Sequence, residues 1–328
     1  MFNNSGVSLD QRFRKLFQDG KLVQIHVCQW GMSYALSDTD LKLEKGLKTS
    51  EAIPGFASLG KKKLMPDDVR LRFKRIEANA RSFLSLNSHK FPVADAHFVP
   101  QKKLPEVIVQ LNKFKVDFDK ATAEFMRDYE VNKQKMLDAY PDHKASLEPY
   151  YPPAASLASK FSFSISVYEV AVPSALKEVD LIDIQAENLA VEEMKKKYQD
   201  QMAEQFQQSS AQMEEFVRES TVALRTRVVE TFQVIADKIA NREVVTATNV
   251  KSLRSIIEEF DGLDFFDDAA VKAKLAEVKA LVKEGADYKT NADAIAKLQE
   301  AVGEVLTTAG KVSDVDTVTG QYFRRLDL

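Results

Sequence analysis

The chain has 328 residues, of which 45% are hydrophobic and 29% charged, so it can form a core and is not disordered as a whole. Its single cysteine, Cys28, excludes an internal disulfide and a four-thiolate metal site within one chain. The absence of a run of about 20 apolar residues and of a signal-peptide core leads us to expect a cytoplasmic protein without a membrane span.

The formal net charge of −3 conceals an uneven distribution. Residues 1–103 hold 18 of the 46 Lys and Arg and 10 of the 49 Asp and Glu, a formal +8 that leaves −11 for the rest. Opposite charges favour association of the two parts, within one molecule or between two copies, and a basic part can also bind nucleic acid. Self-association is the interpretation that we favour.

Three segments have the pattern of strands. Residues 22–30 alternate apolar and polar side chains, and Cys28 is expected to pack beside the core of this strand. Residues 161–167 alternate aromatic and β-branched side chains with serines, which predicts a second strand in the same small sheet. Residues 94–99, bounded by prolines, predict a short third strand.

Two amphipathic helices are predicted next to these strands. One begins at Pro66, with two aspartates in its first turn, where the helix dipole favours negative charge. The other begins at Leu104 and continues to Pro141, which corresponds to roughly 50 Å. Its apolar residues have the three-and-four spacing of a coiled coil. This seam consists of Leu104, Val107, Leu111, Phe114, Phe118, Ala121 and Phe125.

The largest predicted element is one continuous helix from Leu176 to Asn241, a segment without Pro or Gly. Its apolar residues recur every eleven positions. Eleven residues over three turns correspond to about 3.67 residues per turn, which is typical of a nearly straight helix. We therefore expect a rod of roughly 100 Å. The two apolar registers are Val191, Met202, Met213, Leu224 and Ile235, and Phe206, Val217, Val228 and Ile239.

Three shorter helices should follow the rod and pack back on it as hairpins. They are expected to end near Gly262, Gly285 and Gly310. The segment from Ser313 is expected to be loose, although three apolar residues in it could dock. Those residues are Tyr322, Phe323 and Leu326.

These elements predict a mainly α fold, with long coiled-coil-like helices and a small antiparallel β-sheet in the N-terminal half. We expect two regions. Residues 1–173 form a basic α+β region with the sheet and the heptad helix. Residues 174–328 form an acidic all-α region with the rod and the helical hairpins.

No motif predicts a catalytic, cofactor or metal site. Residues 55–61 have the glycine and lysine positions of a P-loop, but Lys62 stands where Ser or Thr must hold magnesium, and Pro66 follows where the helix should be under way. A turn with a basic cluster is expected there instead. The histidines lack metal-ligand spacing, and Asp95 and His97 lack a third partner. We therefore predict a protein that is not an enzyme.

The densest basic region is the best candidate for partner binding. In a nucleic-acid interface its cations would neutralise phosphates, and Phe73 and Phe83 could stack on bases. Both aromatic residues fall on the apolar face of the predicted helix, so we expect them in the core. The candidate partner-binding residues are Lys61, Lys62, Lys63, Arg70, Lys74 and Arg81.

Several short segments together resemble a known family. They are residues 27–31 with Trp30-Gly31, Asp40-Leu41, residues 58–62 followed by Leu64 and Pro66, and residues 161–163 leading to Pro173. In this order they are similar to an uncharacterised phage and bacterial family, a domain of unknown function often encoded beside a MoxR-type or cobaltochelatase-like AAA+ ATPase. The resemblance covers roughly residues 20–240. It implies a phage-type accessory protein of the host cytoplasm, an adaptor or scaffold for such an ATPase.

The leading hypothesis is a non-enzymatic helical scaffold or adaptor that forms homo-oligomers. Apolar seams of roughly 50 to 100 Å must be covered by the chain's own helices or by another copy. A nucleic-acid-binding protein that uses the basic N-terminal region is the alternative.

Overall fold

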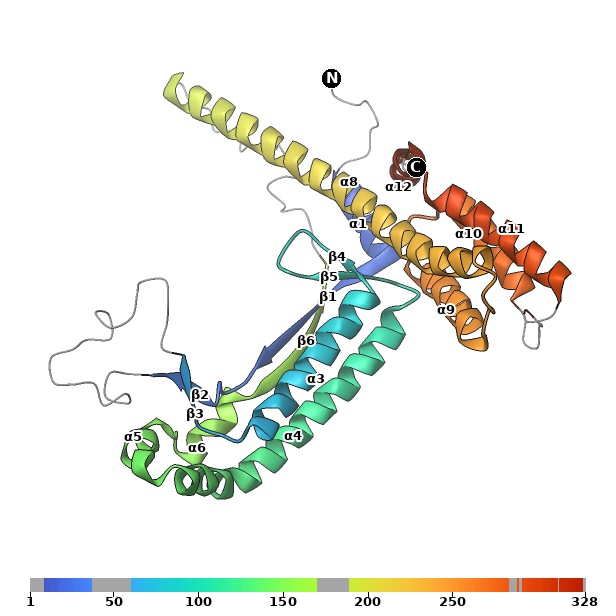
Figure 1. The fold of residues 1–328 in the computed structure, drawn as a ribbon. Coiled ribbons are helices and arrows are strands. Elements are labelled where there is room, and N and C mark those ends of the chain that lie inside the picture. The colour runs from blue at the N-terminus through green and yellow to red at the C-terminus, as the bar shows by residue number, and fades with distance from the viewer. Residues whose placement is uncertain are drawn as a thin grey trace, which may run out of the picture. The chain divides into compact units, whose positions relative to one another are not determined.

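The computed structural model describes residues 9–36, 60–169, 189–282, 288, 291–311 and 313–326, without the side chains of 9–11, 13, 189–203 and 205–207. Within these ranges the chain is mainly helical, with one four-stranded and one two-stranded sheet, as the sequence predicts (Figure 1). It forms two compact units. Unit 1 contains residues 1–23, 87–107 and 167–328, and unit 2 contains residues 24–86 and 108–166. Unit 1 therefore draws on both regions that we distinguished in the sequence.

The four-stranded sheet contains all three predicted strands. In the order in which they are hydrogen-bonded, its strands are β4 (His89–Lys90), β5 (His97–Pro100), β1 (Gly20–Cys28) and β6 (Ser162–Tyr168). β5 pairs antiparallel with both β4 and β1. The strands predicted at residues 22–30, 94–99 and 161–167 are therefore β1, β5 and β6, and they share one sheet.

The alternation predicted for β1 holds from Val23 onward, because Leu22 is buried as well as Val23, and the prediction for its cysteine is wrong. Val23 and Ile25 are buried, whereas His26 and Cys28 are exposed. Because side chains of a strand alternate with a period of two, Cys28 lies on the same face as His26 and points away from the core.

Unit 2 is built on two long helices, α3 (Asp67–Leu86) and α4 (Leu104–Ala139), of which α4 begins in unit 1. Phe73 of α3 packs against Phe118 and Phe125 of α4, with ring centroids 5.4 and 6.0 Å apart. α3 begins one residue after the predicted Pro66, and α4 begins at the predicted Leu104 and ends two residues before Pro141. The apolar seam of α4 is thus covered by the chain's own side chains.

The remaining elements of unit 2 are short. They are β2 (Ser33–Ala35), β3 (Lys61–Lys63), η1 (Pro141–His143), α5 (Lys144–Leu147), η2 (Glu148–Tyr150), α6 (Ala154–Leu157) and η3 (Ala158–Lys160). β2 and β3 pair antiparallel as the two-stranded sheet. Lys61 thus begins a strand, whereas a P-loop would continue into a helix here; residues 55–59 lie outside the described ranges.

Unit 1 is organised around one 52-residue helix, α8 (Leu189–Ala240), which packs against three other helices of the unit. The helices of unit 1 are α1 (Leu9–Asp19), α8, α9 (Ala247–Leu263), α10 (Ala269–Leu281), α11 (Ala292–Ala309) and α12 (Ser313–Leu326). The predicted rod is confirmed from Leu189 onward; residues 176–188 lie outside the described ranges.

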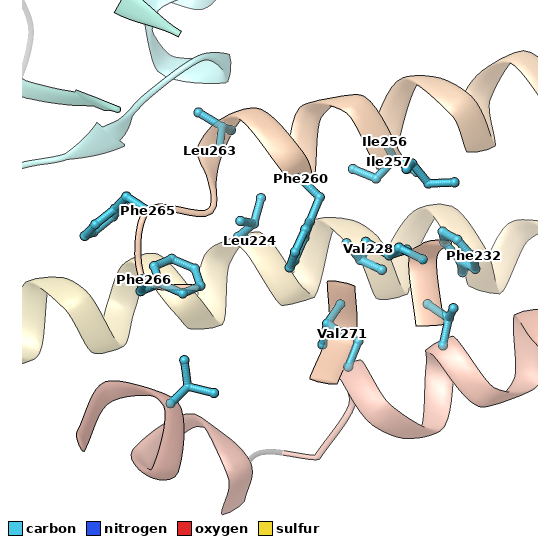
Figure 2. Close-up of a cluster of buried hydrophobic side chains, with 14 of the residues drawn as sticks. Leu224, Val228, Phe232, Ile256, Ile257, Phe260, Leu263, Phe265, Phe266 and Val271 are labelled. Carbon is cyan, nitrogen blue, oxygen red and sulfur yellow. The ribbon is translucent and has the colours of Figure 1, made fainter. Parts of the chain in front are cut away.

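The eleven-residue registers of α8 are buried wherever their side chains are described. These buried residues are Met213, Val217, Leu224, Val228, Ile235 and Ile239. Figure 2 shows how α8 contributes Leu224, Val228 and Phe232 to the core, where they meet Ile257 and Phe260 of α9. The seam of α8 from Met213 onward is therefore covered by helices of the same chain. The side chains of Val191, Met202 and Phe206 lie outside the described set.

The C-terminal helices are bounded by capping residues. Thr246 and Asn249 form a capping box at the start of α9, Asp268 caps α10, and Gly310 follows the last residue of α11. α9 continues through Gly262 to Leu263, slightly beyond the predicted stop.

The expectation of a loose segment after Ser313 is wrong. Residues 313–326 form α12, and its three apolar residues Tyr322, Phe323 and Leu326 are buried. Val315 and Val318 extend the same apolar stripe, so the helix has a continuous face to bury. Across the described ranges, we find no helix with the length and apolar character that crossing a bilayer requires.

Gly20 at the start of β1 is held against β5 so closely that there is no room for a side chain. A Cβ atom there would lie 2.5 Å from the carbonyl oxygen of Val99 and 2.6 Å from Cζ of Phe98. Phe98 is fully buried among other aromatic rings and cannot move aside.

We predict that Gly20→Ala lowers the free energy of unfolding by about 1–3 kcal/mol, because the added methyl overpacks a core that is already full. Chemical denaturation of the purified chain measures the change. Gly303→Ala in α11 is the matched control, since a Cβ there meets no atom within 4 Å. Equal stability of Gly20→Ala and the wild type would contradict the close approach of β1 and β5.

Candidate partner-binding site

The three lysines of β3 do not share one environment. A strand alternates its side chains, and Lys62 is only 7% exposed whereas Lys61 and Lys63 are exposed. The Lys62 ammonium lies 3.5 Å from the centroid of the Tyr150 ring. Tyr34, which pairs with Lys62 across the strands, has its ring 5.0 Å from that of Tyr150. Lys62 thus packs inside unit 2 through a cation–π contact and does not present its charge at the surface.

Two other candidate residues pair with the same aspartate. Nζ of Lys63 lies 2.6 Å from Oδ2 of Asp67, and Nη2 of Arg70 lies 3.2 Å from Oδ1 of the same carboxylate. The hydrogen bond from Lys63 is the main cause that lowers the pKa of Asp67. Farther along α3, Arg81 pairs with Glu77 at 2.9 Å. Three of the six candidate cations, Lys63, Arg70 and Arg81, therefore already pair with two carboxylates of α3.

This face of α3 carries charges of both signs. Residues 67, 70, 74, 77 and 81 recur every three or four positions and so share one side of the helix. Acidic and basic groups mixed on one helix face are typical of a solvated face.

The cations that remain for a partner are few. Lys61 and Lys74 are exposed and form no ion pair within the described part of the chain. Arg75, which the sequence reasoning did not single out, is exposed in the same way; its position next to Lys74 in the basic run was the signal for it. Phe73 is fully buried, and the ring of Phe83 packs against Phe114 at 6.1 Å, so these rings are engaged in packing as predicted.

The strongest cluster of charged groups lies elsewhere, in the core of unit 1, and the sequence reasoning missed it. The side chains of Arg225 on α8 and Asp268 before α10 are 3% and 0% exposed. Nε and Nη2 of Arg225 donate to the two carboxylate oxygens of Asp268 at 2.6 and 3.1 Å. Nη1 of Arg225 also donates to the carbonyl oxygen of Lys311 at 3.0 Å. One guanidinium thereby joins α8 to the start of α10 and the end of α11.

The carboxylates around this ion pair are saturated by partners. Asp268 accepts the backbone N–H of Val271 as the N-cap of α10. Asp264 accepts the backbone N–H of Asp268 at 3.1 Å and pairs with Lys272 at 3.1 Å. Burial raises the pKa of Asp264. These contacts give the cluster a structural role. The sequence signals for it were a charged residue, Arg225, at the edge of the apolar seam of α8 and Asp268 at the position of a helix cap.

The histidines near the sheet are also held by the fold. Ser88 Oγ and His97 Nδ1 are 2.9 Å apart, while Asp95 is exposed in the turn between β4 and β5. Nε2 of His89 lies 2.9 Å from the carbonyl oxygen of Leu263, and since a carbonyl only accepts, Nε2 carries the proton. Among the described residues, no three His, Cys, Asp or Glu side chains are grouped as metal ligands.

The fold and these sites define a mainly helical protein with a small antiparallel sheet, in which a buried ion pair fixes one long helix. Residues 18–287 match the family described as "Protein of unknown function (DUF3150)", and the chain belongs to this family. The match ends before α11 and α12. No curated protein and no solved structure matches the chain.

Replacing one partner of the buried ion pair should destabilise the protein strongly. We predict that Asp268→Leu lowers the free energy of unfolding by about 3–5 kcal/mol, because Arg225 is left buried without a counter-charge. Adding Arg225→Met should restore part of the loss, since the unpaired charge is then gone. Denaturant unfolding of both variants measures these changes. A double variant no more stable than Asp268→Leu would show that the unpaired charge of Arg225 is not the cause of the loss.

His89 should make stability depend on pH. Burial lowers the pKa of His89 to about 4 from 6.5. Between these values the unfolded chain binds a proton that the folded chain does not, so stability falls as pH decreases from 6.5 to 4. The loss at pH 4 is about 3 kcal/mol at most.

The control is His89→Gln, which retains a donor for the carbonyl of Leu263 but does not titrate. We expect the difference in unfolding free energy between wild type and variant to shift in favour of the variant as pH falls. A difference that is constant from pH 7 to 4 would show that His89 is not buried in its neutral form.

Proposed function

We propose that this protein is a non-enzymatic helical scaffold or adaptor, in which the amino-terminal half of α8 binds a partner. One observation carries the proposal. α8 is a single helix of 52 residues, yet the first of its described side chains in the core is Met213. Figure 1 shows the earlier part of α8 (yellow) continuing beyond α9, α10 and α11 of the same unit. At ~1.5 Å per residue, this part is about 36 Å long.

The later half of α8 supports this role because it is firmly fixed. Arg225 ties it to two other helices, and Phe216 stacks on Phe265 in an aromatic cluster with centroids 5.8 Å apart. A helix that is anchored at one end holds its other end in a defined direction relative to its own unit. This is the property that a scaffold or adaptor needs.

Polar side chains lie on α8 just before the core begins. Glu204, Gln208 and Gln212 are exposed, and Gln208 donates to Glu204 at 3.4 Å. Ala211 is exposed among them. This stretch offers hydrogen-bonding groups to a protein partner.

The family resemblance suggests the identity of that partner. We propose a MoxR-type AAA+ ATPase encoded beside this gene, with the chain acting as a phage-type accessory protein. A second copy is the other partner that we propose, and it would have to bind elsewhere than on the seams of α4 and on α8 after Met213, because these are covered within the chain.

The ion pairs of unit 2 favour this proposal over nucleic-acid binding. Lys63, Arg70 and Arg81 face carboxylates, and Lys62 packs on Tyr150. A phosphate backbone would have to compete with these partners.

Ala211→Pro tests the proposal. Proline in a helix interior removes one hydrogen bond and clashes with the preceding turn, so the variant interrupts α8 before Met213. The core survives, since proline is tolerated at the first position of a helix. We expect at least tenfold weaker binding to the purified ATPase in biolayer interferometry, with a Tm close to that of the wild type.

The control is Ala211→Gln, which keeps the helix and the polar surface and should bind like the wild type. Equal affinity of all three chains would contradict a role for the amino-terminal half of α8. A wild-type chain that does not bind the ATPase would eliminate this partner.

A further inference from the structure

α4 has a second apolar stripe, on the side of the helix opposite its buried seam. The three most exposed large hydrophobic side chains of the described residues all lie there: Val116 is 64% exposed, Val109 57% and Val131 56%. Val109 and Val116 each lie two residues from a residue of the seam, which is about 200° around the helix axis. They are seven residues apart, and the exposed Ala123 follows after seven more. This spacing places the three side chains along one line of the helix.

These valines do not stabilise the helix that carries them. Valine loses side-chain freedom in a helix, and alanine, lysine or glutamate at an exposed position would favour the helix more. A single exposed apolar side chain is ordinary, but one that recurs every seven residues is typical of a helix that packs on another helix. Two-stranded coiled coils favour valine at the corresponding core position. The stripe therefore has the pattern of a binding surface.

Basic side chains accompany this stripe. A lysine or arginine follows each of its first three apolar residues by four positions, and all three cations are exposed. Residues four positions apart share one side of a helix, so the cations border the apolar line. We call this surface the outer α4 face, and it consists of Val109, Lys113, Val116, Lys120, Ala123 and Arg127.

Most carboxylates beside the outer α4 face already have partners. Two of them pair with cations that lie outside this face, in the ion pairs Lys115–Asp119, at 2.8 Å, and Arg72–Glu124. Arg127 pairs with Asp128 at 2.9 Å, and Asp117 lies on the next side of the helix without an ion pair in the described ranges. Lys113 and Lys120 likewise form no ion pair with any described residue. Their charges are therefore available to an acidic partner.

We propose that the outer α4 face binds an acidic amphipathic helix of another protein. Apolar residues of that helix, repeated every seven positions, cover Val109 and Val116, and carboxylates beside them pair with Lys113 and Lys120. Two outer α4 faces would bring like charges together, so charge favours an acidic helix over a second copy of α4. The inference is independent of the proposed function, because this face belongs to unit 2 and α8 to unit 1.

The contact should be weak and reversible. At the second core position of each heptad, three residues after the valines, α4 carries the exposed Asn112 and Asp119. Polar residues at core positions lower the stability of a coiled coil. The lysines then contribute mainly to the rate and the specificity of association, and salt screens this contribution. We therefore expect binding that weakens as ionic strength rises.

A synthetic acidic peptide tests the proposal on the full chain. The labelled probe has four heptads, with isoleucine and leucine at the core positions and glutamate on both borders, which prevents it from pairing with itself. Fluorescence anisotropy should show binding to the wild type. Lys113→Glu combined with Lys120→Glu should weaken this binding at least tenfold. The matched control is Lys251→Glu with Lys297→Glu, which reverses two exposed lysines of α9 and α11 and should bind like the wild type.

Val109→Ala combined with Val116→Ala tests the apolar part of the contact. Alanine is the better helix former, so the variant should keep or exceed the wild-type Tm while it binds the peptide several-fold more weakly. Val244→Ala, at a valine that is 51% exposed outside α4, should bind like the wild type. A clear fall in Tm for the double variant would show that the valines are covered within the chain, and would overturn the proposal.

Exchange of the charges identifies the partner chemistry. The chain with Lys113→Glu and Lys120→Glu should bind a peptide in which lysine replaces every glutamate more tightly than the wild type does. A wild-type chain that does not bind the acidic peptide, or equal binding by the charge variant and its control, would overturn the proposal. Duplex DNA that binds through Lys113 and Lys120 where the peptide does not would also overturn it and make this face a nucleic-acid surface.

Discussion

The arrangement of unit 1 depends on one buried ion pair. Arg225 uses two nitrogens on the carboxylate of Asp268 and a third on the carbonyl oxygen of Lys311, so a single side chain on α8 fixes the start of α10 and the end of α11. A buried charge is tolerated only when it is fully paired. The helices must therefore assemble in the one way that brings these groups together, and the apolar seam of α8 is closed from Met213 onward as a result.

Much of this fold follows from periodicity in the sequence. The heptad pattern of α4 and the eleven-residue pattern of α8 predicted helices that exist, and alternation predicted β1 and β6. These patterns are readable because burial of one face imposes a fixed period. Cys28 was misplaced, although the same alternation puts it with His26 on the exposed side. α12 was missed because its β-branched residues and Gly320 have low helix propensity, which tertiary contacts override.

The candidate sites were harder to predict than the fold. Density of lysine and arginine pointed to β3 and α3, but pairing decides whether a cation is available, and pairing is set by neighbours in space. Lys62 lies against Tyr150, which is distant from it in the sequence. Arg225 pairs with Asp268, which is 43 residues further along the chain. No local pattern encodes such distances. The match to the DUF3150 family places the chain among proteins of unknown function, so the proposal of a scaffold rests on the length and anchoring of α8.

We propose that α8 is anchored after Met213 and offers its earlier half to a partner. Hydrogen–deuterium exchange with mass spectrometry tests this directly, in the free chain and in its complex with the ATPase. We expect strong protection of residues 213–240 in both states and new protection of residues 189–212 in the complex. New protection confined to other segments, or weak protection of residues 213–240 in the free chain, would contradict it.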